Sequence, residues 1–142
     1  SAMNLLRLAS YTENSAYTDR APLLLSTIAD RLPEIPAGMG SYLSAADYFL
    51  DKPFEIIIVG PASGEGEREL VAPIRTAFAP NRILSVVTEG ADAQRHAELI
   101  PLIGSKSTIK DKATAYVCEG PVCSLPVTDR EALAPLLDPV AA

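Results

Sequence analysis

A short apolar run near the middle of the chain, Phe54-Glu-Ile-Ile-Ile-Val-Gly60, constrains the fold more than any other feature. It is rich in β-branched residues, follows Pro53 and runs directly into a Gly-Pro turn. A continuous run of this length is typical of a strand that is buried on both faces, as in a parallel sheet. The sequence therefore predicts that a sheet begins immediately after Pro53.

Helical and strand patterns alternate after this run. The predicted elements are a helix over 67–79, a strand over 83–88, a helix over 92–103, a strand over 113–118 and a last helix capped by Asp129 and ended by Pro139. Pro73 is expected to kink the first of these helices or to shift its start. Right-handed crossovers between parallel strands are the default for such an order. We therefore expect a small three-stranded parallel sheet over residues 53–142.

The first third of the chain predicts helices only. One covers residues 4–12, a second is capped by Thr18-Asp19 with Pro22 in its first turn and ends at Pro33 and Pro36, and a third covers residues 40–50. The expected inward side chains are Leu24, Leu25, Ile28 and Leu32 in the second helix, and Leu43, Ala46, Phe49 and Leu50 in the third. The fold class is thus α/β: a helical hairpin segment over residues 1–52, followed by the α/β module.

Composition narrows the classes of partner. The chain has 12 Lys and Arg against 18 Asp and Glu, giving a formal net charge of -6, with no basic cluster. Such a chain is a poor ligand for nucleic acid or for an anionic membrane, and no apolar run has the length of a membrane span. The first residues show no export signal, so we expect a cytoplasmic location with reduced thiols.

The two cysteines, Cys118 and Cys123, flank the turn Glu119-Gly-Pro-Val122. If the chain reverses there, their Cα atoms come within the disulfide range of roughly 4.4–6.8 Å. A disulfide, a redox switch or half of a metal site would follow. Zinc needs four ligands, and the chain adds only a distant His96. The favoured interpretation is two free thiols, with Cys118 in the core; a redox-responsive pair is the alternative.

A second candidate is the loop Gly60-Pro-Ala-Ser-Gly-Glu-Gly66, between a strand and a helix. Helix N-termini in such loops bind anions, which makes Gly60, Ser63, Gly64 and Gly66 candidates for an anion or nucleotide site. The acidic residues Glu65, Glu67 and Glu69 oppose that role and suit the helix start itself. A plain turn is the favoured interpretation, and we expect no cofactor and no metal.

No catalytic group can be assigned from the sequence. His96 lies among polar neighbours with no nucleophile signature, and Asp47, Asp51 and Glu55 belong to different predicted elements. An exposed helix histidine and scattered surface carboxylates are the simpler interpretation.

One segment resembles a known family. Lys112-Ala-Thr-Ala-Tyr-Val-Cys118, continuing to Cys123-Ser-Leu-Pro-Val-Thr-Asp129, is similar to the C-terminal tail of YyaL-type proteins. The resemblance extends to Asn4-Leu-Leu-Arg-Leu-Ala9 with the predicted helix from Thr18 to Leu32, and to the Phe54–Gly60 and Pro80–Ile83 stretches. These large proteins join a thioredoxin-like domain to a six-hairpin (α/α) toroid like that of glycosidases.

The resemblance implies that residues 1–52 correspond to the last hairpins of the toroid. The chain would then be a non-catalytic C-terminal fragment with a structural or association role, and the remainder of the parent protein would be its partner. The family's redox motif would lie outside this chain. A truncated toroid leaves apolar helix faces uncovered, so we also expect a homodimer.

Overall fold

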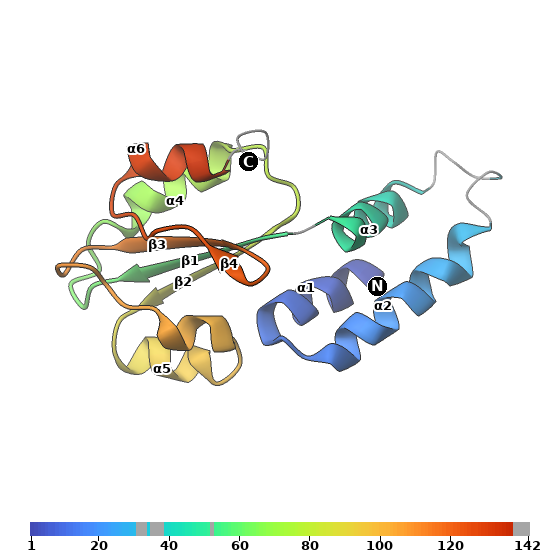
Figure 1. Cartoon of the computed structure of the whole chain (residues 1–142), viewed down its shortest axis with the longest axis horizontal. Helices are drawn as coiled ribbons and strands as arrows, with labels where there is room; N and C mark the ends of the chain where they lie inside the picture. Colours follow the sequence, from blue (N-terminus) through green and yellow to red (C-terminus); the bar gives the residue numbers. More distant parts are fainter. Residues whose placement is uncertain (31–33, 35–38, 52, 138–142) are drawn as a thin grey trace. The chain divides into compact units, whose positions relative to one another are not determined.

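The computed structural model describes residues 1–30, 34, 39–51 and 53–137 (Figure 1). The chain divides into two compact units, Ser1–Pro53 and Phe54–Ala142. Some predicted features lie outside the described residues. They are the helix stops at Pro33, Pro36 and Pro139 and the inward residue Leu32. Within the described part of the chain, no helix combines the length and the apolar character that crossing a bilayer requires.

The first unit contains three helices, α1 (Ala2–Thr12), α2 (Ser15–Ala29) and α3 (Gly40–Leu50). The predicted cap at Thr18-Asp19 is wrong, because α2 begins earlier: the Asn14 side chain accepts a hydrogen bond from the Ala16 N–H. Pro22 consequently lies inside α2 and not in its first turn.

The core of this unit is small. Its buried hydrophobic residues are Leu6, Ala21, Leu25, Ala45 and Tyr48. The prediction that Leu24 and Ile28 of α2 point inward is wrong, since both side chains are exposed, whereas Leu25 is buried as predicted. The same prediction is wrong for Leu43, Phe49 and Leu50 of α3, which are exposed, while Ala45 and Tyr48 occupy its buried face. Hydrophobic pattern misplaced the inner face because α3 is apolar on more than one side.

The second unit is built on a four-stranded sheet, β1 (Phe54–Gly60), β2 (Arg82–Thr88), β3 (Thr114–Glu119) and β4 (Val122–Cys123), in the order β2-β1-β3-β4. The α/β class and the position of β1 are as predicted. The β1 and β2 strands pair in parallel. β3 is antiparallel to β1, and β4 is an additional strand, so the prediction of three parallel strands is wrong in these two respects.

The reversal of β3 has a local cause. After β2 the chain forms α5 (Ala91–Ala97) and a 3-10 helix, η2 (Pro101–Ser105), which packs back against α5. The chain thereby returns to the carboxyl end of β1 and β2, where Thr108 binds Glu89. A strand that starts from this end of the sheet must run antiparallel to β1.

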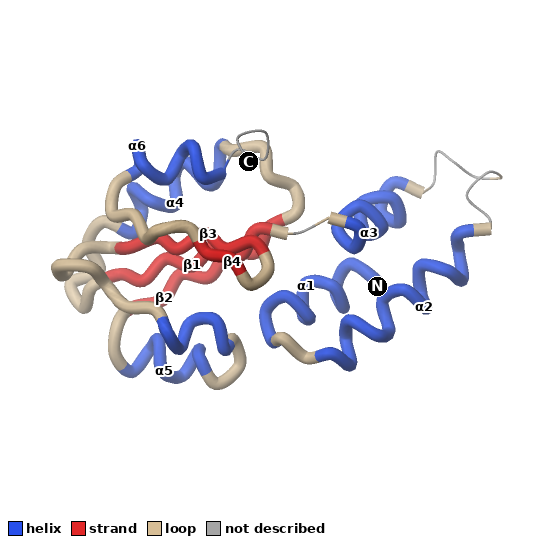
Figure 2. Tube along the Cα trace, in the orientation of Figure 1, coloured by secondary structure: helices blue, strands red, loops and turns tan. Residues whose placement is uncertain are grey.

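Helices cover both faces of the sheet (Figures 1 and 2). On one face α4 (Glu67–Thr76) packs with α6 (Arg130–Leu133) and the 3-10 helix η3 (Ala134–Leu137), over Ile56 and Ile58 of β1. On the other face η2 and α5 pack over Ile57 and Val59. This confirms the prediction of a strand buried on both sides, and the predicted cap at Asp129 is confirmed by its hydrogen bond from the Ala132 N–H.

Candidate functional site

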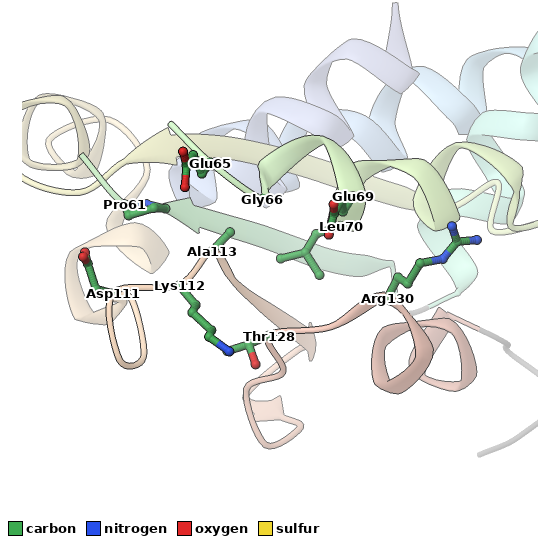
Figure 3. A pocket seen from close by; sticks show the side chains of 10 residues that line it. All are labelled: Pro61, Glu65, Gly66, Glu69, Leu70, Asp111, Lys112, Ala113, Thr128 and Arg130. Atoms are coloured by element: carbon green, nitrogen blue, oxygen red, sulfur yellow. The ribbon is translucent and has the colours of Figure 1, made fainter. Parts of the chain in front are cut away.

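A groove of about 580 Å³ lies where β1 ends, α4 begins and β3 starts. Figure 3 shows Pro61, Glu65 and Gly66 on one side of it and Asp111 and Lys112 on the other. The antiparallel register brings these segments together, because Val59 near the end of β1 pairs with Thr114 at the start of β3. Ligands of open α/β sheets bind at this carboxyl end of the parallel strands.

The charges of the groove are mixed. Glu65, Glu69 and Asp111 supply three acidic groups, against the basic Lys112 and Arg130. The groove therefore has one more negative than positive side chain, which disfavours binding of an anion. The N-terminus of α4, which favours an anion, opens into the groove at Gly66. The sequence could not indicate Lys112 or Arg130, because their place in the groove depends on the direction of β3.

The four predicted anion-binding residues do not act as one group in this groove. Gly66 lines it and adopts a left-handed conformation (φ 86°) as the cap of α4. Ser63 and Gly64 are exposed and do not line the groove, whereas Gly60 is buried at the end of β1. An anion or nucleotide site over residues 60–66 stays a prediction.

Gly60 packs closely against the side chain of Glu67. A methyl group at this position would overlap the side chain of Glu67, the first residue of α4. The Glu67 Oε1 atom is buried there and has no hydrogen-bond partner within the described residues. A carboxylate oxygen held this way is costly unless it is satisfied, so the packing of the loop depends on Gly60 and Glu67 jointly.

Gly60→Ala should therefore lower the free energy of unfolding of the second unit, and Glu67→Ala should remove most of that cost. The double-mutant cycle should show a coupling of about 1 kcal/mol, as expected for side chains in direct contact. Urea unfolding of the two single variants and the double variant measures it. Gly40→Ala is the control, since open space surrounds that glycine. Strictly additive effects at residues 60 and 67 would show that the contact carries no energy.

A second polar cluster fixes the loop opposite α4. The Glu89 carboxylate accepts hydrogen bonds from the Thr108 N–H and hydroxyl at 2.9 and 2.7 Å. The buried Thr114 hydroxyl accepts from the Ile109 N–H and donates to the Lys112 carbonyl. Lys110 and Asp111, which lie between Ile109 and Lys112, both have a positive φ, so the chain turns tightly beside the groove.

The Glu89 contact predicts a pH dependence. The hydroxyl and then the N–H of Thr108 lower the pKa of Glu89 below its ordinary value of 4.5. A carboxylate with a depressed pKa in the folded state stabilises the fold above its unfolded pKa, and that contribution is lost as the pH falls through the folded value. Glu89→Gln should flatten the fall in melting temperature between neutral pH and pH about 3. Glu98→Gln, at an exposed carboxylate near the end of α5, should give the same curve of melting temperature against pH as the unchanged chain. Identical curves for the two variants would contradict the role of the Glu89 contact.

The two cysteines lie at the opposite end of β3. A disulfide joins Cys118 to Cys123, which face each other across the β3–β4 hairpin with Cα atoms 3.9 Å apart. Two free thiols, the interpretation that the sequence favoured, are therefore not what the structure shows, although Cys118 is buried as predicted. The redox alternative stays a prediction.

The local geometry explains this pairing. Because Glu119 pairs with Val122, the hairpin loop contains two residues, Gly120 and Pro121. Gly120 has a positive φ, whereas the ring of Pro121 fixes a negative φ. A positive φ followed by a negative one is the pattern of a type II′ turn. The Ser124 N–H donates to the Val117 carbonyl, which makes the neighbouring pair of cysteines a non-hydrogen-bonded one. Side chains at such positions lie closest together.

The predicted helix histidine, His96, lies on α5. The His96 side chain is half exposed, and its ring Nδ1 lies near the backbone carbonyl and the carboxylate of Asp92 on the same helix. Within the described residues, no three His, Cys, Asp or Glu side chains lie close enough to bind a metal ion.

Comparison with known proteins finds relatives of greater length. The chain is 30% identical to human (Homo sapiens) spermatogenesis-associated protein 20 over 139 residues, which is 98% of this chain and 18% of that protein. The mouse (Mus musculus) protein of the same name is 27% identical over 91% of this chain and 16% of its own length. The chain thus spans less than a fifth of the relatives it matches, in agreement with a resemblance to part of a larger protein. No family model and no solved structure matches it.

Proposed function

We propose that this chain is a non-catalytic structural module of a larger parent protein, and that its helical unit docks onto further helices of that parent. The observation that carries the proposal is the apolar character of α3 on opposite faces. One face is buried within the unit, and the other is exposed among the residues that the structure describes.

Helix periodicity shows the two faces. Ala45 and Tyr48 are buried at 2% and 3% exposure. Leu43 and Leu50, seven residues apart and therefore on one stripe, are 48% and 82% exposed. At 100° per residue this stripe lies on the side of α3 opposite to the buried pair. A helix with apolar residues on all sides is typical of a buried position.

The adjacent helix supports the same conclusion. Leu24 and Ile28 of α2, one turn apart, are 45% and 40% exposed. Among its described residues, the unit meanwhile has a buried cluster of five hydrophobic side chains, two of them alanines. A segment of this size rarely stabilises itself with so small a core. Covering the exposed leucines with further helices would supply the missing burial. We define the docking face as Leu24, Ile28, Leu43 and Leu50.

Further helices of a longer polypeptide are the partner that best fits the docking face. The similarity to the human protein runs through 98% of this chain, so both units have counterparts in a polypeptide several times longer. The resemblance to YyaL-type proteins supplies an (α/α) toroid, whose neighbouring hairpins would pack on the docking face, and a thioredoxin-like domain elsewhere in the parent. Without the rest of the parent, two copies of this chain would cover each other through the same face.

Sedimentation of the chain, alone and mixed with the remainder of the parent expressed as a separate polypeptide, tests the proposal. We expect a homodimer for the chain alone and a one-to-one complex in the mixture, formed at the expense of the homodimer. A chain that stays monomeric both alone and in the mixture would contradict the docking role.

A further inference from the structure

We propose that the Cys118–Cys123 disulfide is a thiol–disulfide exchange site, which a thiol reductant opens by attack on the sulfur of Cys123. This site lies in the second unit and does not depend on the docking face, so it stands or fails separately from the structural role. Three observations support it: unequal exposure of the two cysteine residues, a hairpin held by other contacts, and an apolar recess beside the bond.

Access differs sharply between the two cysteines. Cys118 is 1% exposed and belongs to β3, which has β1 on one side and β4 on the other. Cys123 is exposed and belongs to β4, a strand of two residues at the edge of the sheet. A thiolate arriving from solvent therefore meets Cys123 first, and exchange depends on which sulfur can be reached.

Contacts other than the disulfide also hold the hairpin. The type II′ turn at Gly120 and the hydrogen bonds from the Ser124 N–H and hydroxyl to the Val117 carbonyl hold β4 beside β3. The bridged residues are only five positions apart, and a loop this short constrains the unfolded chain less than a long one does. Reduction of the bond should leave the two thiols facing each other, so that the disulfide can form again on oxidation.

A small recess of about 230 Å³ adjoins the bond. Its walls are Phe54, Val117, Val122 and Leu136, together with both cysteines, Glu119 and Ser124. Val122 and Leu125, on either side of Cys123 in sequence, are 69% and 86% exposed. The carbon chain that carries an attacking thiol can rest against this apolar wall.

The exchange balances as a two-electron reduction. The reductant's thiolate forms a bond to the Cys123 sulfur, the bond between the two cysteines breaks, and the electron pair leaves on Cys118, which takes a proton from solvent. With a dithiol, the second thiolate then attacks the reductant's own sulfur in the mixed disulfide. This step releases Cys123 as a thiolate, which is protonated, and leaves the reductant as a disulfide.

The test uses the full chain under native conditions, with dithiothreitol and glutathione as the two thiol probes. After an alkylating quench, dithiothreitol should yield two free thiols, and the far-ultraviolet circular dichroism should not change. The melting temperature should fall by roughly 5–10 °C, as the loss of a short disulfide loop implies. Glutathione should yield a mixed disulfide that peptide mass spectrometry locates at Cys123.

A matched pair of variants tests the difference in access. The single thiol left in Cys118→Ala should react with Ellman's reagent at least about tenfold faster than the thiol left in Cys123→Ala. A disulfide that resists dithiothreitol until denaturant is added, or glutathione found on Cys118, would overturn the proposal. The glutathione measurement needs no variant, so it decides the question even where a substitution prevents folding.

Discussion

Leu50→Asp should strongly weaken association of the helical unit, both with the remainder of the parent and with a second copy of the chain. Leu50 is 82% exposed, so the change leaves the unit's own core intact. In the docked state it would place a carboxylate against apolar helices, where an unpaired charge costs several kcal/mol. We expect the dissociation constant to rise by about 100-fold or more, since each 1.4 kcal/mol is a factor of ten.

The matched control is Phe78→Asp, which alters an even more exposed apolar side chain (85%) in the second unit. It should leave both association equilibria unchanged. Sedimentation of the two variants, with circular dichroism to establish that each is folded, gives the comparison. If both variants associate as strongly as the unsubstituted chain, α3 does not contribute to an interface.

Ile58→Ala should strongly destabilise the second unit. Ile58 is fully buried in β1, the strand between β2 and β3, within the cluster that includes Leu70 and Leu133. Removing a large aliphatic side chain from such a site costs about 2–5 kcal/mol through lost burial and the cavity that remains. Urea unfolding followed by circular dichroism should show a lower midpoint with an unchanged slope.

Val86→Ala provides the comparison, because Val86 is 41% exposed on β2, at the edge of the same sheet. Its cost should be well below that of Ile58→Ala. The helical unit has a hydrophobic cluster of its own, so hydrogen exchange of α1 should change little in either variant. Equal costs at residues 58 and 86 would be inconsistent with β1 as the centre of the core.

Sequence pattern predicted those parts of the fold that depend on local chemistry. The run from Phe54 to Gly60 corresponds to β1 residue for residue, and the third helix has its predicted bounds of Gly40 and Leu50. The cap at Asp129 also follows from local chemistry, because a side-chain acceptor at a helix start acts within three residues.

The parts that were missed depend on distant contacts. The direction of β3 follows from the reversal of η2 against α5, which no periodicity indicates. β4 was missed because its two residues are too few to show a pattern. The groove residues Lys112 and Arg130 come together only through that topology. The inner face of α3 was misassigned for a different reason: its outer leucines carry the same apolar signal as a core.

Hydrogen exchange of the helical unit tests the docking claim most directly. In the isolated chain at concentrations too low for dimers, amides of α1, α2 and α3 should exchange quickly, because the small core formed by the described part of this unit limits the free energy of local opening. In complex with the remainder of the parent, the same amides should slow by at least about tenfold, while those of β1 should not change. Equal exchange of the three helices in the two states would contradict the account.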